Sequence, residues 1–232
     1  MIVLRRLVTA AAMVSGVGLV MTGCAVTPLK MGSAAIVGSQ RISVATLGSQ
    51  ASNLSQAASR YPGVISLSPT QETQATLTWL IRYQINDEVA RQAGITVTTA
   101  QAAAALASAY QSAAATAEQQ GVTNVSLGLI LAGSGVPPDT SAQLGRYEAI
   151  ANQYVKMANG GRAPVSSSAQ TAAEAKLSTA ECQAAKALDI AVNPQYGQLD
   201  YSEYSVVSVP NPVARAAGPS ASASPVTTAP AC

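Results

Sequence analysis

Apolar side chains recur at helical spacing along most of the chain, and polar or small residues separate these stretches. The strongest stripe consists of apolar residues that lie four positions apart: Leu77, Ile81, Ile85 and Val89. An apolar side chain every three or four residues indicates one buried face of an α-helix. The pattern predicts helices, with their caps, over residues 43–58, 68–94, 98–120, 126–132, 144–158 and 166–188.

Two of these helices begin with the same capping signal. Ser68 is followed three residues later by Gln71, and Thr98 is followed at the same spacing by Gln101. This is the spacing of a capping box, in which the N-cap hydroxyl and the glutamine side chain each accept a backbone N–H from the other residue. Gly94 is expected to end the first of the two helices as its C-cap. That helix carries the strongest apolar stripe, and we expect it to form the centre of the fold.

Short extended segments flank the helices. Residues 34–37 and 190–192 are predicted to be strands, and residues 204–209 form a further extended stretch rich in β-branched side chains. From residue 210 onward Pro, Ala, Ser and Thr predominate, and such a tail lacks the apolar surface needed to order itself. The expected fold class is therefore mainly α, a helical bundle with a small β-sheet.

The N-terminus has the organisation of a secretion signal. Arg5 and Arg6 precede an apolar run, residues 7–20, which is shorter than the roughly 20 residues of a spanning helix. The sequence VMTGC then ends at Cys24, and it resembles the lipobox of bacterial lipoproteins. The resemblance implies cleavage between Gly23 and Cys24, lipidation of the Cys24 thiol, and anchoring at the extracytoplasmic face of the cell membrane. A plain signal peptide or an uncleaved anchor is the alternative.

Removal of such a signal changes both the length and the charge of the working protein. The chain then divides into a signal peptide (1–23), a membrane-proximal linker (24–33), a helical domain (34–209) and a Pro/Ala/Ser/Thr-rich tail (210–232). The whole chain has 13 Lys and Arg against 11 Asp and Glu, but loss of the two signal arginines leaves 11 of each sign. A chain of zero net charge has no basic surface for nucleic acid, so we expect no nucleic-acid partner.

The absence of histidine excludes much enzyme chemistry. With no histidine in 232 residues, the chain has no Ser-His-Asp or Cys-His catalysis, no histidine general base and no histidine-ligated zinc. The acidic residues are scattered without metal-ligand spacing, and the glycines follow no phosphate-loop pattern. We therefore expect no catalytic, cofactor-binding or metal-ligating residues, and a protein that is not an enzyme.

Three cysteines raise the question of a disulfide. Cys24 is assigned to the lipid, which leaves Cys182 and Cys232. In an oxidising compartment these two thiols would pair and tie the C-terminal tail to a helix. The alternative is that Cys182 is simply a small helix residue and Cys232 a terminal thiol, and the sequence leaves both open.

Two separated motifs point to a known family. The first is AAIVGSQRIS at residues 34–43, followed by a helix that contains Leu47, and the second is DIAVNPQYGQLD at residues 189–200. Together they resemble the opening and closing segments of the SurA-like N-terminal chaperone domain, which also occurs in PrsA-type foldases. The resemblance implies that the two ends of the domain pair as a small sheet beside a helical bundle. Gln195 and Leu199 depart from the family, which has a basic and an aromatic residue there.

The same resemblance argues against one activity of the family. Its foldases insert a parvulin-type prolyl isomerase domain, and no domain of that size and pattern fits between residues 160 and 190. Parvulin sites normally use histidines, which this chain lacks. Prolyl isomerase activity is therefore not expected.

Two functional hypotheses follow. The first is a lipid-anchored, non-catalytic, chaperone-like protein that binds secreted or unfolded polypeptides in a groove between apolar helix faces. Four tyrosines are candidates to line this groove, unless they are edges of the core: Tyr83, Tyr110, Tyr147 and Tyr154. The second hypothesis is a structural or accessory envelope lipoprotein that binds one specific protein partner.

Overall fold

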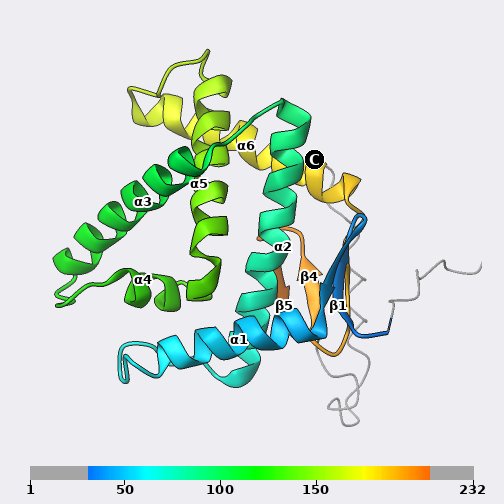
Figure 1. Ribbon diagram of the computed structural model, residues 1–232. Helices are drawn as coiled ribbons and strands as arrows, with labels where there is room; N and C mark the ends of the chain where they lie inside the picture. The colour runs from blue at the N-terminus through cyan, green and yellow to red at the C-terminus, as the bar shows by residue number, and fades with distance from the viewer. Residues whose placement is uncertain (1–30, 210–232) are drawn as a thin grey trace, which may run out of the picture.

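Helices dominate residues 31–209, the part of the chain that the computed structural model describes (Figure 1). The helices are α1 (Val44–Ala58), α2 (Pro69–Ala93), α3 (Thr99–Gln119), α4 (Leu127–Gly133), the 3-10 turn η1 (Pro138–Thr140), α5 (Ser141–Ala158) and α6 (Ser167–Ala187). The strands are β1 (Ser33–Val37), β2 (Gln40–Ser43), β3 (Ala191–Val192), β4 (Gln198–Asp200) and β5 (Ser205–Val207). The mainly α fold class is confirmed. The predicted signal peptide, lipidation site and C-terminal tail lie outside the described residues.

The first and last segments of the domain meet in a three-stranded antiparallel sheet of order β2-β1-β3. Ala35 of β1 pairs with Val192 of β3, so the expected pairing of the N-terminal and C-terminal strands is present. Asn193 extends it, because its backbone N–H donates to the carbonyl of Ala34 at 2.9 Å and its side-chain amide donates to that of Ser33 at 3.1 Å. The Asn-Pro turn after β3 is thus used to close the domain.

A second sheet, the β4–β5 hairpin, was not predicted as such. The sequence indicated one extended stretch, residues 204–209, but the strand there is shorter and pairs with residues 198–200. The hairpin lies on α2, where the backbone N–H of Val206 donates to the buried hydroxyl of Thr78 at 2.8 Å. Leu199 of β4 is buried in the core.

Helix α2 runs through the middle of the molecule, with the strands on one side of it and α5 on the other (Figure 1). Its predicted stripe is buried: Leu77 and Ile81 are fully shielded from solvent, and Ile85 and Val89 nearly so. These side chains form one cluster with strand residues, with Leu47 of α1, and with small residues of α6. Burial of such side chains contributes roughly 1.5–3 kcal/mol each, so α2 organises the fold.

Both predicted capping boxes are present. Ser68 Oγ accepts from the backbone N–H of Gln71, and the Gln71 side chain accepts from the N–H of Ser68 at 2.8 Å. Thr98 and Gln101 make the same pair of bonds at the start of α3. Gly94 ends α2 with φ +66°, a left-handed conformation that glycine adopts without strain.

Candidate binding grooves along helix α3

Helix α3 packs against its neighbours without burying any of its own residues. Its main contact is α5, and the two backbones approach closely at Gly145, where a methyl group would lie 2.5 Å from the carbonyl oxygen of Ala102. Such an approach requires a glycine at position 145, because a side chain there would collide with the α3 backbone. Although α3 and α5 are in extensive contact, no residue of α3 is buried, so both of its flanks stay accessible.

A groove follows each flank of α3, and we call the two together the α3 grooves. One, of about 400 Å³, lies between the start of α3 and the start of α5, and Ala102, Leu106 and Gly145 are part of its lining. The other, of about 480 Å³, lies between α3 and the segment that leads into α4, with Tyr110 and Leu127 in its lining. Ala103 and Leu106 line both grooves. The grooves therefore flank the same stretch of helix.

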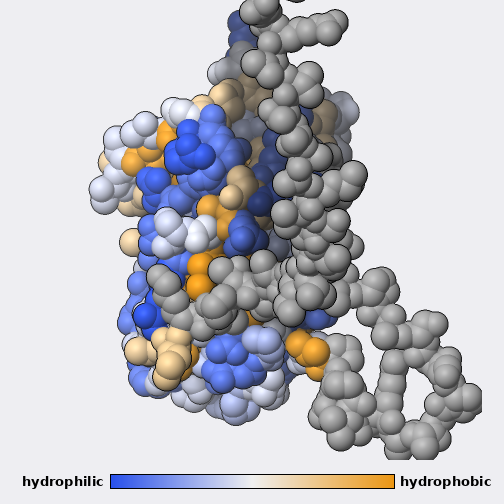
Figure 2. All heavy atoms as spheres, turned by 90° about the vertical axis from the view of Figure 1, so that its right-hand side faces the viewer, coloured by the Kyte–Doolittle hydropathy of each residue, from blue (hydrophilic) through white to orange (hydrophobic). Residues whose placement is uncertain are grey.

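The surface of α3 around these grooves is almost without charge. Glu118 is the only charged residue of the helix, and eleven of its 21 residues are alanine. The opposite side of the molecule is different: in Figure 2, which views the side away from α3, hydrophilic and hydrophobic residues are interspersed over the coloured surface. An uncharged apolar stretch of this length suits contact with another apolar segment.

Only one of the four candidate tyrosines lines these grooves. Tyr110 does so, and its hydroxyl donates to the backbone carbonyl of Val125 at 3.1 Å. Tyr154 instead packs against the main core.

Tyr83 and Tyr147 form an aromatic cluster with Trp79 between α2 and α5. The ring centroids of Trp79 lie 5.8 Å from those of Tyr83 and of Tyr147. Burial raises the pKa of both tyrosines to about 12, so both stay neutral. The Tyr83 hydroxyl is hydrogen-bonded to Thr140 at 3.1 Å. These two tyrosines pack in the aromatic cluster and do not line the α3 grooves.

Of the three cysteines, only Cys182 lies within the described residues. Cys182 lies on α6 and is disulfide-bonded. Cys24 and Cys232 lie outside the described residues, as does Gly23, so pairing of Cys182 with Cys232 and lipidation at Cys24 stay predictions.

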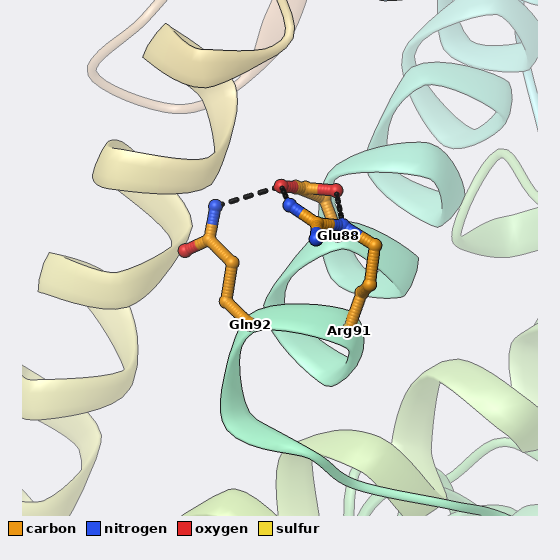
Figure 3. Close-up of polar contacts among 3 residues, drawn as sticks. All are labelled: Glu88, Arg91 and Gln92. Atoms are coloured by element: carbon orange, nitrogen blue, oxygen red, sulfur yellow. Dashed lines mark hydrogen bonds and ion pairs between the residues drawn. The ribbon is translucent and has the colours of Figure 1, made fainter.

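The best-paired carboxylate of the domain is a structural one. Glu88 of α2 accepts hydrogen bonds from Arg91 Nε at 2.7 Å and from Gln92 Nε2 at 2.8 Å (Figure 3). The Arg91 guanidinium lowers the pKa of Glu88, and Gln92 lowers it further. These bonds join neighbouring turns near the end of one helix.

Within residues 31–209, no three Asp, Glu or Cys side chains gather closely enough to hold a metal ion. Over the same residues, no helix combines the length and apolarity needed to cross a membrane. Comparison of the chain with protein-family models, with curated proteins and with solved structures finds no match.

Proposed function

We propose that this protein is a lipid-anchored, non-enzymatic binding protein for secreted or unfolded polypeptides, and that the α3 grooves hold them. The observation that carries the proposal is the one-sided packing of α3. A 21-residue helix that buries none of its residues leaves apolar surface on both flanks for another chain. Contact with an apolar segment would remove this surface from water, at roughly 25 cal/mol per Å².

Two further features support the proposal. The pairing of β1 with β3 is the arrangement that the SurA-like resemblance implies, and we propose on this basis that the domain is of that chaperone type. The small side chains of α3 favour shallow contact along an extended segment and disfavour a deep pocket for one large side chain. Shallow contact of this kind makes few demands on the side chains of the bound segment, which suits a chaperone-like role.

The test uses charges placed in the grooves. Ala103 and Ala107 are exposed and line the grooves, so Ala103→Glu and Ala107→Glu should leave the fold intact while placing a carboxylate against any bound apolar segment. We expect the unmodified protein to suppress light scattering by a reduced, aggregating secreted protein, and the two variants to lose most of this effect. Ala115→Glu is the matched control, because Ala115 is exposed on the same helix but does not line the grooves. Equal suppression by all variants, or none by the unmodified protein, would contradict the proposal.

Crosslinking in cells separates general polypeptide binding from the accessory role. A photo-crosslinking amino acid at position 107 should capture many secreted proteins if the grooves bind unfolded chains. A single dominant adduct would instead favour the accessory lipoprotein with one partner.

Anchoring is tested by replacing Cys24 with serine. The lipid-attachment proposal predicts that the Cys24→Ser protein moves from the membrane fraction to the soluble fraction. If the variant stays with the membranes, the proposed anchor is wrong.

A further inference from the structure

A polar pocket away from the α3 grooves has the composition of a binding site. It lies where α6 meets α2 and α5, has a volume of about 240 Å³, and is closed by the turn between β4 and β5. The lining residues that matter here are Arg82, Tyr147, Ser178, Glu181, Glu203 and Tyr204. We call it the Glu181 pocket. It is smaller than the roughly 300–1,000 Å³ of pockets for drug-sized ligands, so its ligand is a small group.

Glu181 is the unusual member of this pocket. Within residues 31–209 its carboxylate takes part in no hydrogen bond and no ion pair, in contrast to that of Glu88. Burial raises the pKa of Glu181, and the charge of Arg82 offsets only part of that effect. Because no group of residues 31–209 donates a hydrogen bond to it, this half-buried carboxylate can accept one from a donor that enters the pocket.

Arg82 is the cation in the lining, and it is already engaged. Its Nη2 donates to the backbone carbonyl of Glu203 at 2.5 Å, and its guanidinium carbon lies 5.3 Å from the centre of the Trp79 ring. The first contact ties the β4–β5 turn to α2, and the second holds the guanidinium against an aromatic ring. Arg82 therefore shapes the pocket but leaves the Glu181 carboxylate open to another cation.

The turn that closes the pocket is held in a strained form. Tyr204 has φ +47°, a left-handed conformation that is unusual for a bulky side chain and is kept only where surrounding contacts impose it. Asp200 holds the turn from the other side, by accepting from the backbone N–H of Ser202 at 2.8 Å and from its hydroxyl at 2.7 Å. The wall of the pocket is thus preformed, which lowers the entropy lost when a ligand binds.

We propose that the Glu181 pocket binds a primary ammonium or guanidinium group. Its lining residues include two glutamates, Glu181 and Glu203, and one cation, Arg82, which is already held by the Glu203 backbone carbonyl and the Trp79 ring, so the pocket favours a further cation. The inference does not depend on the α3 grooves, because Glu181, Arg82 and the β4–β5 turn lie outside them. The cation is supplied either by a free small amine or by a lysine or arginine side chain of a polypeptide.

The test compares two ligands of nearly equal shape, n-butylammonium and n-butanol. Calorimetric titration of the full-length protein in detergent at pH 7.5 should show saturable binding of the cation and none of the alcohol. Glu181→Gln should weaken binding of n-butylammonium at least tenfold. Glu174→Gln is the matched control, because Glu174 is exposed on the same helix and should leave the affinity unchanged.

Two safeguards keep the result decisive. Glu181→Gln is isosteric and removes an unpaired charge, so it should fold, and its melting curve checks this. Equal binding of the alcohol and the cation, or unchanged affinity in Glu181→Gln, would overturn the proposal. A short peptide with a central lysine, set against one with norleucine, then distinguishes the sources. Preference for the lysine peptide supports a polypeptide side chain, and binding of butylammonium alone supports a free amine.

Discussion

Helices α2 and α3 follow each other in the chain and begin with the same capping box. They differ in how much of each helix is buried. Nine of the 25 residues of α2 are buried, whereas none of the 21 residues of α3 is. The two helices are stabilised by different means. Helix α2 contains many residues of modest helix propensity and depends on packing, whereas α3 is rich in alanine, the best helix former.

This difference separates the helix that builds the core from the helix whose surface is available for binding. A helix that needs burial to exist must sit in the core, and α2 does so against both sheets and α6. A helix that is stable through its own backbone can keep its flanks exposed, and α3 does so beside the grooves proposed for binding. The capping box therefore sets where each helix begins. The size of the side chains then decides how much of the helix is buried.

The largest expected effect is the loss of a core side chain from α2. Leu77→Ala should lower the free energy of unfolding by about 2–5 kcal/mol, because it leaves a cavity in a fully buried cluster. Leu106→Ala removes the same atoms from a half-exposed position of α3 and should cost no more than about 1 kcal/mol. Urea denaturation measures both. Equal losses would show that α3 is as deeply integrated as α2.

The next effect concerns the close approach of α3 to α5. Gly145→Ala places a methyl group 2.5 Å from the carbonyl oxygen of Ala102, so α3 must shift, at a cost of about 1–3 kcal/mol. Faster amide exchange throughout α3 should accompany the loss. Gly48→Ala in α1 is the control, because nothing lies within 4 Å of its added carbon, and it should stabilise by up to about 1 kcal/mol. Unchanged exchange in α3 would show that the contact with α5 does not hold it.

Local signals in the sequence were sufficient for the helices but not for the second sheet. The capping residues and the period-four stripe of α2 act within a few positions, so they can be recognised without the fold. Strands β4 and β5 have only three residues each, too few for an alternating pattern. The hairpin that they form also contacts α2, where Val206 donates to Thr78, a residue distant in the chain.

The sites were harder to predict because their members come from several elements. Tyr83, Tyr110 and Tyr147 look alike in the sequence, and only their tertiary neighbours separate groove from core. The Glu181 pocket did leave one signal. Glu181 lies three and four residues before the buried Ala184 and Ala185, which places a carboxylate toward the inner face of an amphipathic helix.

The capping boxes give a smaller effect that sharpens the contrast. Ser68→Ala and Thr98→Ala each remove one hydroxyl acceptor, worth about 1 kcal/mol at an N-cap. We expect Ser68→Ala to lower global stability in urea, because α2 unfolds only with the core. Thr98→Ala should chiefly accelerate amide exchange in the first turns of α3, since that helix can open by itself. The contrast between the helices fails if both variants lose global stability equally.

The smallest effect concerns the carboxylate of Glu148, on the helix α5 that contacts both α2 and α3. Burial raises the pKa of Glu148 in the folded protein above the ordinary value of 4.5, so the folded state favours its protonated form. The contribution of Glu148 to stability is therefore present below pH 4.5 and is lost as the pH rises through the folded pKa. Glu148→Gln keeps the neutral form at every pH. The variant should thus be more stable than the unmodified protein at pH 7 and equal to it at pH 4.

Thermal unfolding across that pH range measures the difference. The exposed Glu118→Gln, which alters the single charge of α3, is the control and should change stability by less than about 0.5 kcal/mol. A Glu148→Gln protein that is less stable than the unmodified one at pH 7 would mean that this carboxylate has a partner at the α5 surface. The packing around α5 would then be more polar than its burial implies. The contrast between α2, which is stabilised by apolar contacts, and α3, which is stabilised by its own backbone, would then need a third, electrostatic contribution.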